Sequence, residues 1–178
     1  MSVEYNSARR GYPLDLYIYL RTLVVAQTPY TLDIGCGTGI STRELKESFF
    51  DVIGADKDTE MIETAEKRGS GIKYIIASAN GLPFSDNEFD LVTAFTAFHW
   101  FNDEKSLIEI RRVLKSEGVF FAALKGNRES EETRAFREGY MAILKKYTGG
   151  HFDRTKEHFR TDIVRSLFRD VTEKSFYV

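Results

Sequence analysis

Three closely spaced glycines and the acid before them form the pattern in this chain that best suits chemistry. They lie in the stretch Asp33-Ile-Gly-Cys-Gly-Thr-Gly39, and Thr31, Leu32 and Ile34 predict a short buried strand that leads into the glycines. A glycine-rich turn between a strand and a helix lets the backbone approach a ligand closely, because no Cβ intrudes and a positive φ costs little. The helix expected from residue 40 points its free N–H groups at this turn. The arrangement suits a nucleotide-like ligand with an anionic or polar end.

The glycine spacing separates two kinds of nucleotide cofactor. In a dinucleotide-binding fingerprint the third glycine follows the second by three residues, and a pyrophosphate rests on the helix N-terminus. Here Gly39 follows Gly37 by two residues, and Asp33 stands just before Gly35. We expect the Asp33 carboxylate to repel a pyrophosphate and to attract the ammonium of an amino-acid ligand. An NAD-dependent dehydrogenase is therefore a disfavoured alternative, and a glycine turn without any ligand is the other.

Three further stretches follow in a fixed order: Val-Ile-Gly-Ala-Asp at 52–56, Gly-Leu-Pro-Phe-Ser-Asp-Asn-Glu-Phe-Asp at 81–90, and Glu-Ile-Arg-Arg-Val-Leu-Lys at 109–115. With residues 33–39 they resemble the class I S-adenosylmethionine (SAM)-dependent methyltransferases, in the small-molecule branch that includes the ubiquinone-biosynthesis and trans-aconitate enzymes. The resemblance covers residues 5–123. It implies an α/β fold with a Rossmann-like, doubly wound, mostly parallel sheet in three αβα layers. It also implies methyl transfer from SAM to a small organic acceptor by direct in-line displacement.

The resemblance implies where the cofactor binds. Asp56, at the end of the second predicted strand, is placed to accept hydrogen bonds from a ribose diol. The alternative is that Asp56 merely caps the next helix, a role for which Asp58 is better suited. Met61 matches a position that packs on the adenine ring, and it could equally be a core residue. Ser78 stands where relatives usually carry an acid, and its hydroxyl accepts a hydrogen bond more weakly than a carboxylate does. The complete predicted set is Asp33, Gly35, Cys36, Gly37, Gly39, Asp56, Lys57, Met61, Ser78, Ala79 and Phe95.

An aromatic run ends the fourth predicted strand, residues 89–95. Phe95, Phe98, His99, Trp100 and Phe101 gather there, and the carboxyl ends of strands in an open α/β sheet form the ligand crevice. We therefore expect the methyl acceptor to bind against Phe98, His99 and Trp100. His99 is the candidate catalytic base, with a simple wall residue as the alternative.

An N-terminal segment completes the predicted substrate site. The resemblance places Tyr5, Arg9 and Tyr12 in a segment that folds over the cofactor site. The alternative is that these residues lie on the surface, ahead of a packing helix that begins near Pro13.

The chain is expected to form a single domain, residues 1–178. Residues 1–29 form an N-terminal cap segment and helix, 30–124 the cofactor-binding core, 125–160 a possible substrate lid, and 161–178 a last helix and strand. Within the core we predict helices at 40–48 and 58–68, strands at 52–56, 72–77 and 119–124, and a helix capped by Asn102 or Asp103. A sixth strand is predicted at 171–178. The family's seventh, antiparallel strand has no residues left, so we expect a truncated chain or a partner at that sheet edge.

Composition restricts the function classes. The chain of 178 residues is 42% hydrophobic and 29% charged, which is typical of a soluble globular domain. Its 25 basic and 27 acidic residues give a net charge of −2, so no nucleic-acid partner is predicted. The single cysteine, Cys36, excludes an intramolecular disulfide and suits the cytoplasm. We predict no membrane span and no metal, and a monomer or homodimer. A SAM-binding protein without catalytic activity remains the main alternative, because of Ser78 and the missing strand.

Overall fold

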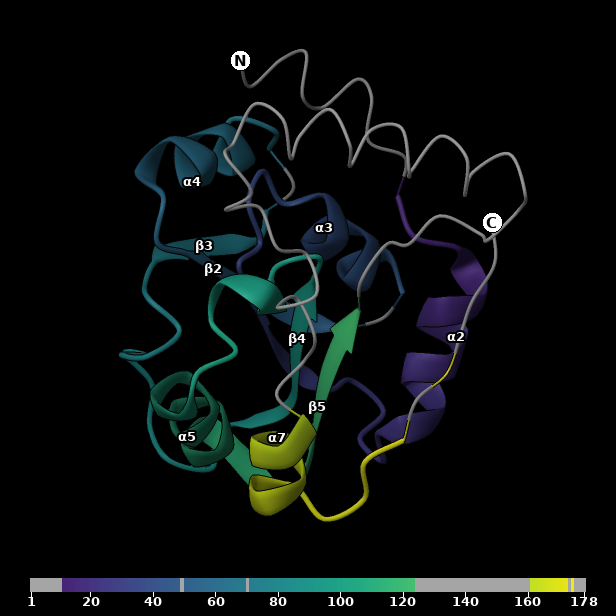
Figure 1. Cartoon of the computed structure of the whole chain (residues 1–178). Helices are drawn as coiled ribbons and strands as arrows, with labels where there is room; N and C mark the ends of the chain where they lie inside the picture. The colour runs from purple at the N-terminus through teal and green to yellow at the C-terminus, as the bar shows by residue number, and fades with distance from the viewer. Residues whose placement is uncertain (1–10, 49, 70, 124–160, 173, 175–178) are drawn as a thin grey trace, which may run out of the picture.

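The computed structural model describes residues 11–48, 50–69, 71–123, 161–172 and 174. Within them, five parallel strands form one sheet in the order β3-β2-β1-β4-β5 (Figure 1). The strands are β1 (Tyr30–Ile34), β2 (Asp51–Asp56), β3 (Lys73–Ile76), β4 (Phe89–Phe95) and β5 (Leu114–Ala123). The helices are α2 (Leu14–Leu23), α3 (Ile40–Glu47), α4 (Thr59–Glu66), the 3₁₀ turn η1 (Phe98–Trp100), α5 (Glu104–Val113) and α7 (Thr161–Leu167). The predicted Rossmann-like α/β fold is confirmed.

Helices cover both faces of the sheet, as Figure 1 shows for α2 on one side and α5 and α7 on the other. On the first face Leu20 of α2 and Leu45 of α3 pack against Leu91 of β4. On the opposite face Ile110 of α5 packs against Val92 of β4. Because successive strand residues point to opposite faces, strands with nearly continuous apolar runs supply both cores. The result is a doubly wound sheet in three layers.

Two of these helices begin at aspartates that the sequence predicted as caps. The Asp58 side chain accepts hydrogen bonds from the backbone N–H groups of Glu60 and Met61 at the start of α4. The Asp103 side chain accepts from the N–H of Ser106 at the start of α5. Each cap satisfies N–H groups that have no partner inside the helix. Both caps follow the carboxyl ends of strands, so they also fix the loops that border the sheet edge.

The fifth strand begins earlier than predicted. Pairing starts with Leu114 opposite Phe89, is interrupted by a register shift, and resumes with Val119 opposite Leu91. Residues 115–118 therefore form an irregular stretch within β5, and Gly118 lies inside the strand. A Cβ on Gly118 would lie 2.9 Å from the Leu114 side chain. The regular part of β5 does begin at Val119, as predicted.

Other predicted elements differ from the structure or lie outside it. The helix predicted to begin near Pro13 spans Leu14–Leu23 and buries Leu16, Tyr17 and Leu20, whereas its apolar residues Leu14 and Ile18 are exposed. In the predicted sixth strand, the described residues Val171, Thr172 and Lys174 adopt no strand structure. The remaining residues of 171–178 lie outside the described residues, as do the whole predicted lid at 125–160 and both Tyr5 and Arg9.

The order of the strands creates a crevice between β1 and β4. The chain leaves β1 toward β2 on one side, whereas β4 lies on the other side of β1. Connections that diverge in this way leave an opening at the carboxyl ends of the two strands, which is where open α/β sheets bind ligands. The glycine turn follows β1 and the aromatic run follows β4, so both predicted halves of the site meet there.

A buried carboxylate ties this edge together. Asp33 of β1 is fully buried and accepts hydrogen bonds from three hydroxyls. Ser41 and Thr42 at the start of α3 donate to Oδ2 at 2.9 and 2.8 Å, and Thr93 of β4 donates to Oδ1 at 2.9 Å. Burial raises the pKa of Asp33 from 3.8 to about 6, and the three hydroxyls limit the rise. The carboxylate thus joins β1, β4 and the helix after the glycine turn.

Removing this carboxylate should change how stability depends on pH. The pKa of Asp33 is higher in the folded state than in the unfolded state. Its contribution to the free energy of unfolding is therefore full below pH 4 and is lost as pH rises through about 6. The wild-type protein should therefore lose on the order of 3 kcal/mol relative to Asp33→Asn between pH 4 and 7. Urea unfolding of both proteins across this range measures the difference. A difference that stays constant with pH would contradict the assigned pKa.

Candidate cofactor site

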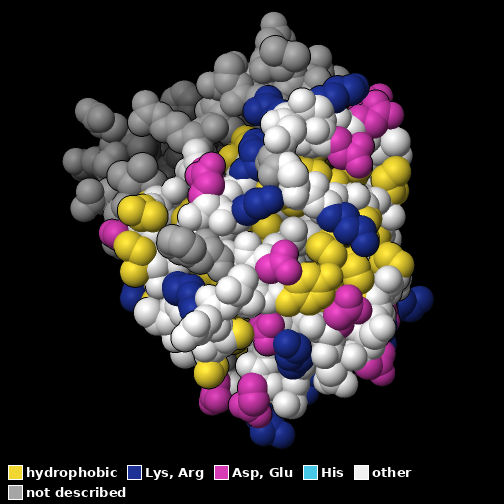
Figure 2. Space-filling view, turned by 180° about the vertical axis from the view of Figure 1, so that it is seen from behind, with side chains coloured by type: hydrophobic (Ala, Val, Ile, Leu, Met, Phe, Trp, Pro, Cys, Tyr) yellow, Lys and Arg dark blue, Asp and Glu magenta, His cyan; other side chains and the backbone are white. Residues whose placement is uncertain are grey.

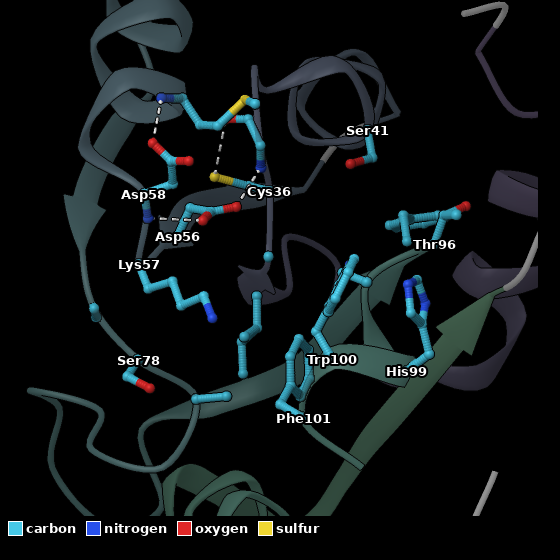
Figure 3. A pocket seen from close by; sticks show the side chains of 18 of the residues that line it. Cys36, Ser41, Asp56, Lys57, Asp58, Ser78, Thr96, His99, Trp100 and Phe101 are labelled. Atoms are coloured by element: carbon cyan, nitrogen blue, oxygen red, sulfur yellow. Dashed lines mark hydrogen bonds between the residues drawn. The ribbon is translucent and has the colours of Figure 1, made fainter. Parts of the chain in front are cut away.

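A cavity of about 720 Å³ lies at the carboxyl ends of the strands. This volume falls within the range of roughly 300–1,000 Å³ that is common for small-molecule sites. Figure 3 shows Asp56, Lys57, Asp58 and Ser78 along one side of the cavity, and Thr96, His99 and Trp100 along the opposite side. The first group comes from the ends of β2 and β3, and the second from the end of β4. The two sides therefore differ in chemistry as well as in origin.

The glycine turn forms part of the cavity wall, and its glycines serve different purposes. Gly35, Gly37 and Gly39 all have positive φ, between 54° and 74°. A Cβ on Gly35 would lie 2.5 Å from the Cβ of Ala97, and one on Gly39 would lie 2.4 Å from the Tyr74 hydroxyl. A Cβ on Gly37 would meet no atom within 4 Å. Gly35 and Gly39 are thus required by the packing of the protein, whereas at Gly37 the turn leaves open space that a ligand can occupy.

The Asp56 carboxylate is held in place by backbone N–H groups. Its Oδ2 accepts from Gly37 at 2.8 Å, and its Oδ1 accepts from Asp58 at 3.0 Å. A carboxylate has about four acceptor positions, so two hydrogen bonds leave capacity for a further pair. Asp56 lines the cavity beside the glycine turn. The geometry suits the binding of a ribose diol, because both oxygens are oriented before a ligand arrives.

At the opposite side of the cavity, aromatic side chains form the wall. The rings of His99 and Trp100 lie 4.8 Å apart, and Trp100 is 76% exposed. Tyr12 also lines the cavity, and its ring packs on Phe95 at 4.7 Å between centroids. Thr96 has φ of +54°, which is rare for a β-branched residue. A mostly aromatic wall with a few polar groups suits a small organic ligand.

Most of the predicted site residues line this cavity. The predicted cofactor residues that do so are Gly35, Cys36, Gly37, Asp56, Lys57, Met61, Ser78, Ala79 and Phe95, and the predicted substrate residues are Tyr12, His99 and Trp100. Burial, together with the Asp33 and Asp56 carboxylates, raises the pKa of the Cys36 thiol. The thiol therefore stays protonated at neutral pH, and Cys36 is a wall residue rather than a nucleophile.

Three of the predicted site residues that the structure describes do not line the cavity. Asp33 is fully buried beneath the turn, so it cannot attract a ligand ammonium directly and instead orients the turn and α3. Gly39 caps α3 against Tyr74. Phe98 is only 1% exposed and packs on Ala94 and Leu107, with its ring 5.3 Å from that of Phe120. Phe98 is thus a core residue because η1 turns its side chain toward α5, while the neighbouring His99 reaches the cavity.

Several cavity residues were missed by the sequence reasoning. Thr38 directly precedes the third glycine, Ser41 follows it by two residues, and Thr96 directly follows β4. Their positions next to predicted motifs were the available signal. Asp103 and Ser106 also line the cavity, where both Asp103 oxygens accept hydrogen bonds from Ser106. The sequence identified Asp103 only as a helix cap.

The fold and the cavity define an α/β protein with a cavity suited to a nucleotide cofactor at the carboxyl ends of β1 and β4. Residues 32–122 match the family model described as a methyltransferase domain. An uncharacterized methyltransferase of Schizosaccharomyces pombe is 30% identical over 97% of this chain and 71% of its own length. A probable SAM-dependent methyltransferase of Saccharomyces cerevisiae is 32% identical over 67% of this chain and 43% of its own length.

Solved structures show the same likeness. A SAM-dependent methyltransferase of Thermotoga maritima, named as a possible histamine N-methyltransferase, superposes with a TM-score of 0.59 and 26% identity. The match covers 86% of this chain and 69% of that one. The chain therefore belongs to the methyltransferase domain family, and the S. cerevisiae relative and the T. maritima structure are both named as SAM-dependent. The chain spans less than half of the S. cerevisiae relative.

Among the described residues, every helix is too short or too polar to cross a membrane.

The two kinds of glycine in the turn should respond differently to substitution. Gly37→Val should abolish SAM binding, because its side chain fills ligand space, while the far-UV circular dichroism stays close to that of the wild type. A β-branched residue at φ of +54° is strained, so some loss of melting temperature is also expected. Gly35→Ala should mainly lower the melting temperature, because its Cβ meets Ala97. Calorimetric titration and thermal melting separate the two effects. Unfolding of Gly37→Val would show that this glycine is structural instead.

Asp56→Ala should weaken SAM binding by about 1.5–3 kcal/mol, the range for hydrogen bonds to a charged group. Asp51→Ala is the matched control, because Asp51 lies at the other end of β2, away from the cavity. The control should leave the dissociation constant for SAM unchanged. Equal affinity of the Asp56 variant and the wild type would refute the ribose assignment.

Proposed function

We propose that this protein transfers the methyl group of SAM to a small, largely apolar organic acceptor that binds against His99 and Trp100. The observation that supports the proposal best is one continuous cavity with two chemically different sides. One side carries the glycine turn and Asp56, and the other carries aromatic side chains. A two-substrate transfer requires such an arrangement, since donor and acceptor must bind next to each other.

The cofactor half is assigned to the residues around the glycine turn. Asp56 would bind the ribose of SAM. Met61, Ser78 and Ala79 lie beyond Asp56 toward β3, where the adenine ring would bind. The Lys57 side chain also lines this part of the cavity. When bound, SAM supplies an electrophilic methyl group on a sulfonium. Aromatic faces such as that of Tyr12 attract such a cation by about 0.5–2 kcal/mol.

The acceptor half contributes mainly position. Holding two reactants in line can supply roughly 7–11 kcal/mol of a barrier without any dedicated catalytic group. A base is needed only when the acceptor must lose a proton first. His99 lines the cavity and is the candidate for that role, with Thr96 and Tyr12 as neighbouring hydroxyls. Trp100, with most of its side chain exposed, forms the outer wall.

The surface supports a small acceptor rather than a nucleic acid. On the face shown in Figure 2, the basic and acidic side chains of the described residues are interspersed. A nucleic-acid substrate would call for a basic patch that neutralises phosphates. The net charge of −2 favours the same conclusion.

An acceptor screen with isotopically labelled SAM tests the proposal. We expect methyl transfer to at least one neutral phenol or amine in a panel of small aromatic compounds. For an acceptor that must be deprotonated, His99→Asn should slow the transfer by about 10²–10⁴-fold, the range for a positioned general base. The dissociation constant for S-adenosylhomocysteine should stay unchanged in that variant.

Two outcomes would count against the proposal. Tight SAM binding without transfer to any acceptor in the panel would favour a cofactor-binding protein that lacks catalytic activity. A His99→Asn variant that turns over at the wild-type rate would leave His99 as a wall residue only.

A further inference from the structure

Glu44 links the helix after the glycine turn to the segment that enters α2. It lies on α3 and does not line the cavity. Its Oε2 accepts hydrogen bonds from the backbone N–H of Tyr12 at 3.2 Å and from the Tyr17 phenol at 2.5 Å. Burial and the bond to Glu44 raise the pKa of Tyr17, so the phenol remains a donor at all ordinary pH values. One carboxylate thus holds two donors from the same stretch of chain.

Tyr12 connects this carboxylate to the cavity. Its ring lines the cavity and packs on Phe95, and its phenol forms a hydrogen bond with the Thr96 hydroxyl. The Thr96 N–H donates to the carbonyl of Ala123 at 2.7 Å, which helps to hold Thr96 in its left-handed conformation. Tyr12 is therefore fixed at two points: by Glu44 at its backbone and by Thr96 at its phenol.

Gly11 makes the approach to Glu44 possible. A Cβ at this position would lie 1.6 Å from Oε1 of Glu44. The end of a glutamate side chain can often move aside, but here it would have to leave the Tyr12 and Tyr17 hydrogen bonds. The sequence Gly11-Tyr12-Pro13 can be understood in these terms. The glycine allows the contact, the tyrosine reaches the cavity, and the proline with φ of −63° starts α2.

We propose that Glu44 is a positioning residue of the cofactor site. By holding Tyr12 in the cavity wall, this carboxylate outside the cavity controls how tightly the cofactor is retained. The inference rests on SAM as the cofactor and does not depend on which acceptor is methylated. It requires only that the Tyr12 side chain encloses the bound cofactor together with the end of β4.

The test measures binding of S-adenosylhomocysteine by calorimetry and its dissociation rate by competition. Glu44→Ala should raise the dissociation constant by about tenfold or more, the effect of losing a hydrogen bond to a charged group. Most of the change should appear as faster dissociation. Glu44→Gln keeps an amide oxygen that can accept from Tyr12 and Tyr17, so it should recover most of the affinity. Glu47→Ala, on the exposed side of the same helix, is the matched control and should bind as the wild type does.

Gly11→Ala provides an independent second variant, because it leaves Glu44 intact but displaces its carboxylate. It should reproduce the weaker binding and faster dissociation of Glu44→Ala. Wild-type affinity and dissociation rate in both folded variants would overturn the proposal. So would a lower melting temperature with unchanged binding, since that result would make Glu44 purely structural. A wild-type protein that fails to bind S-adenosylhomocysteine would overturn the cofactor assignment itself, and this proposal with it.

Discussion

The buried carboxylate of Asp33 is the interaction on which the site most depends. A charge that is fully removed from water is costly unless hydrogen bonds compensate for it. Here Ser41, Thr42 and Thr93 provide them from two different elements. Those hydroxyls satisfy the carboxylate only when α3 begins directly above β1 and when β4 pairs beside it. The charge therefore fixes the relative positions of the strand, the turn and the helix that border the cavity.

Around this fixed centre, the remaining contacts orient the groups that face a ligand. Gly37 donates to Asp56, so the turn itself holds the predicted ribose ligand. The Tyr12 phenol forms a hydrogen bond with the Thr96 hydroxyl, and the Tyr12 backbone N–H donates to Glu44. The walls of the cavity are thus positioned by hydrogen bonds between elements far apart in sequence. Such preorganisation reduces the ordering that binding would otherwise require.

Much of the fold could be predicted from the sequence, because the signals are local. The strand at 89–95 has the predicted bounds, and polar turn residues directly precede its mostly apolar run. Aspartates before apolar periodic segments identified the caps of α4 and α5. Motif order also placed the glycine turn and the aromatic run at one edge of the sheet. These inferences need only periodicity, turn chemistry and topology.

What the sequence could not show is the direction in which each side chain leaves its element. Phe98 and His99 are neighbours, yet one is in the core and the other lines the cavity. Asp33 has the residue type and the position of a ligand-binding acid, but its three hydroxyl partners lie eight or more residues away in the sequence. The Glu44–Tyr12 contact joins residues 32 positions apart. Pairings of this kind depend on how the layers pack, which a single sequence does not encode locally.

The central claim is that this cavity binds SAM rather than a dinucleotide, and one calorimetric titration tests it most directly. The protein is titrated with SAM and, separately, with NAD under identical conditions. The account predicts saturable binding of SAM with one molecule per chain and no measurable heat with NAD. Saturable binding of NAD together with no binding of SAM would contradict it.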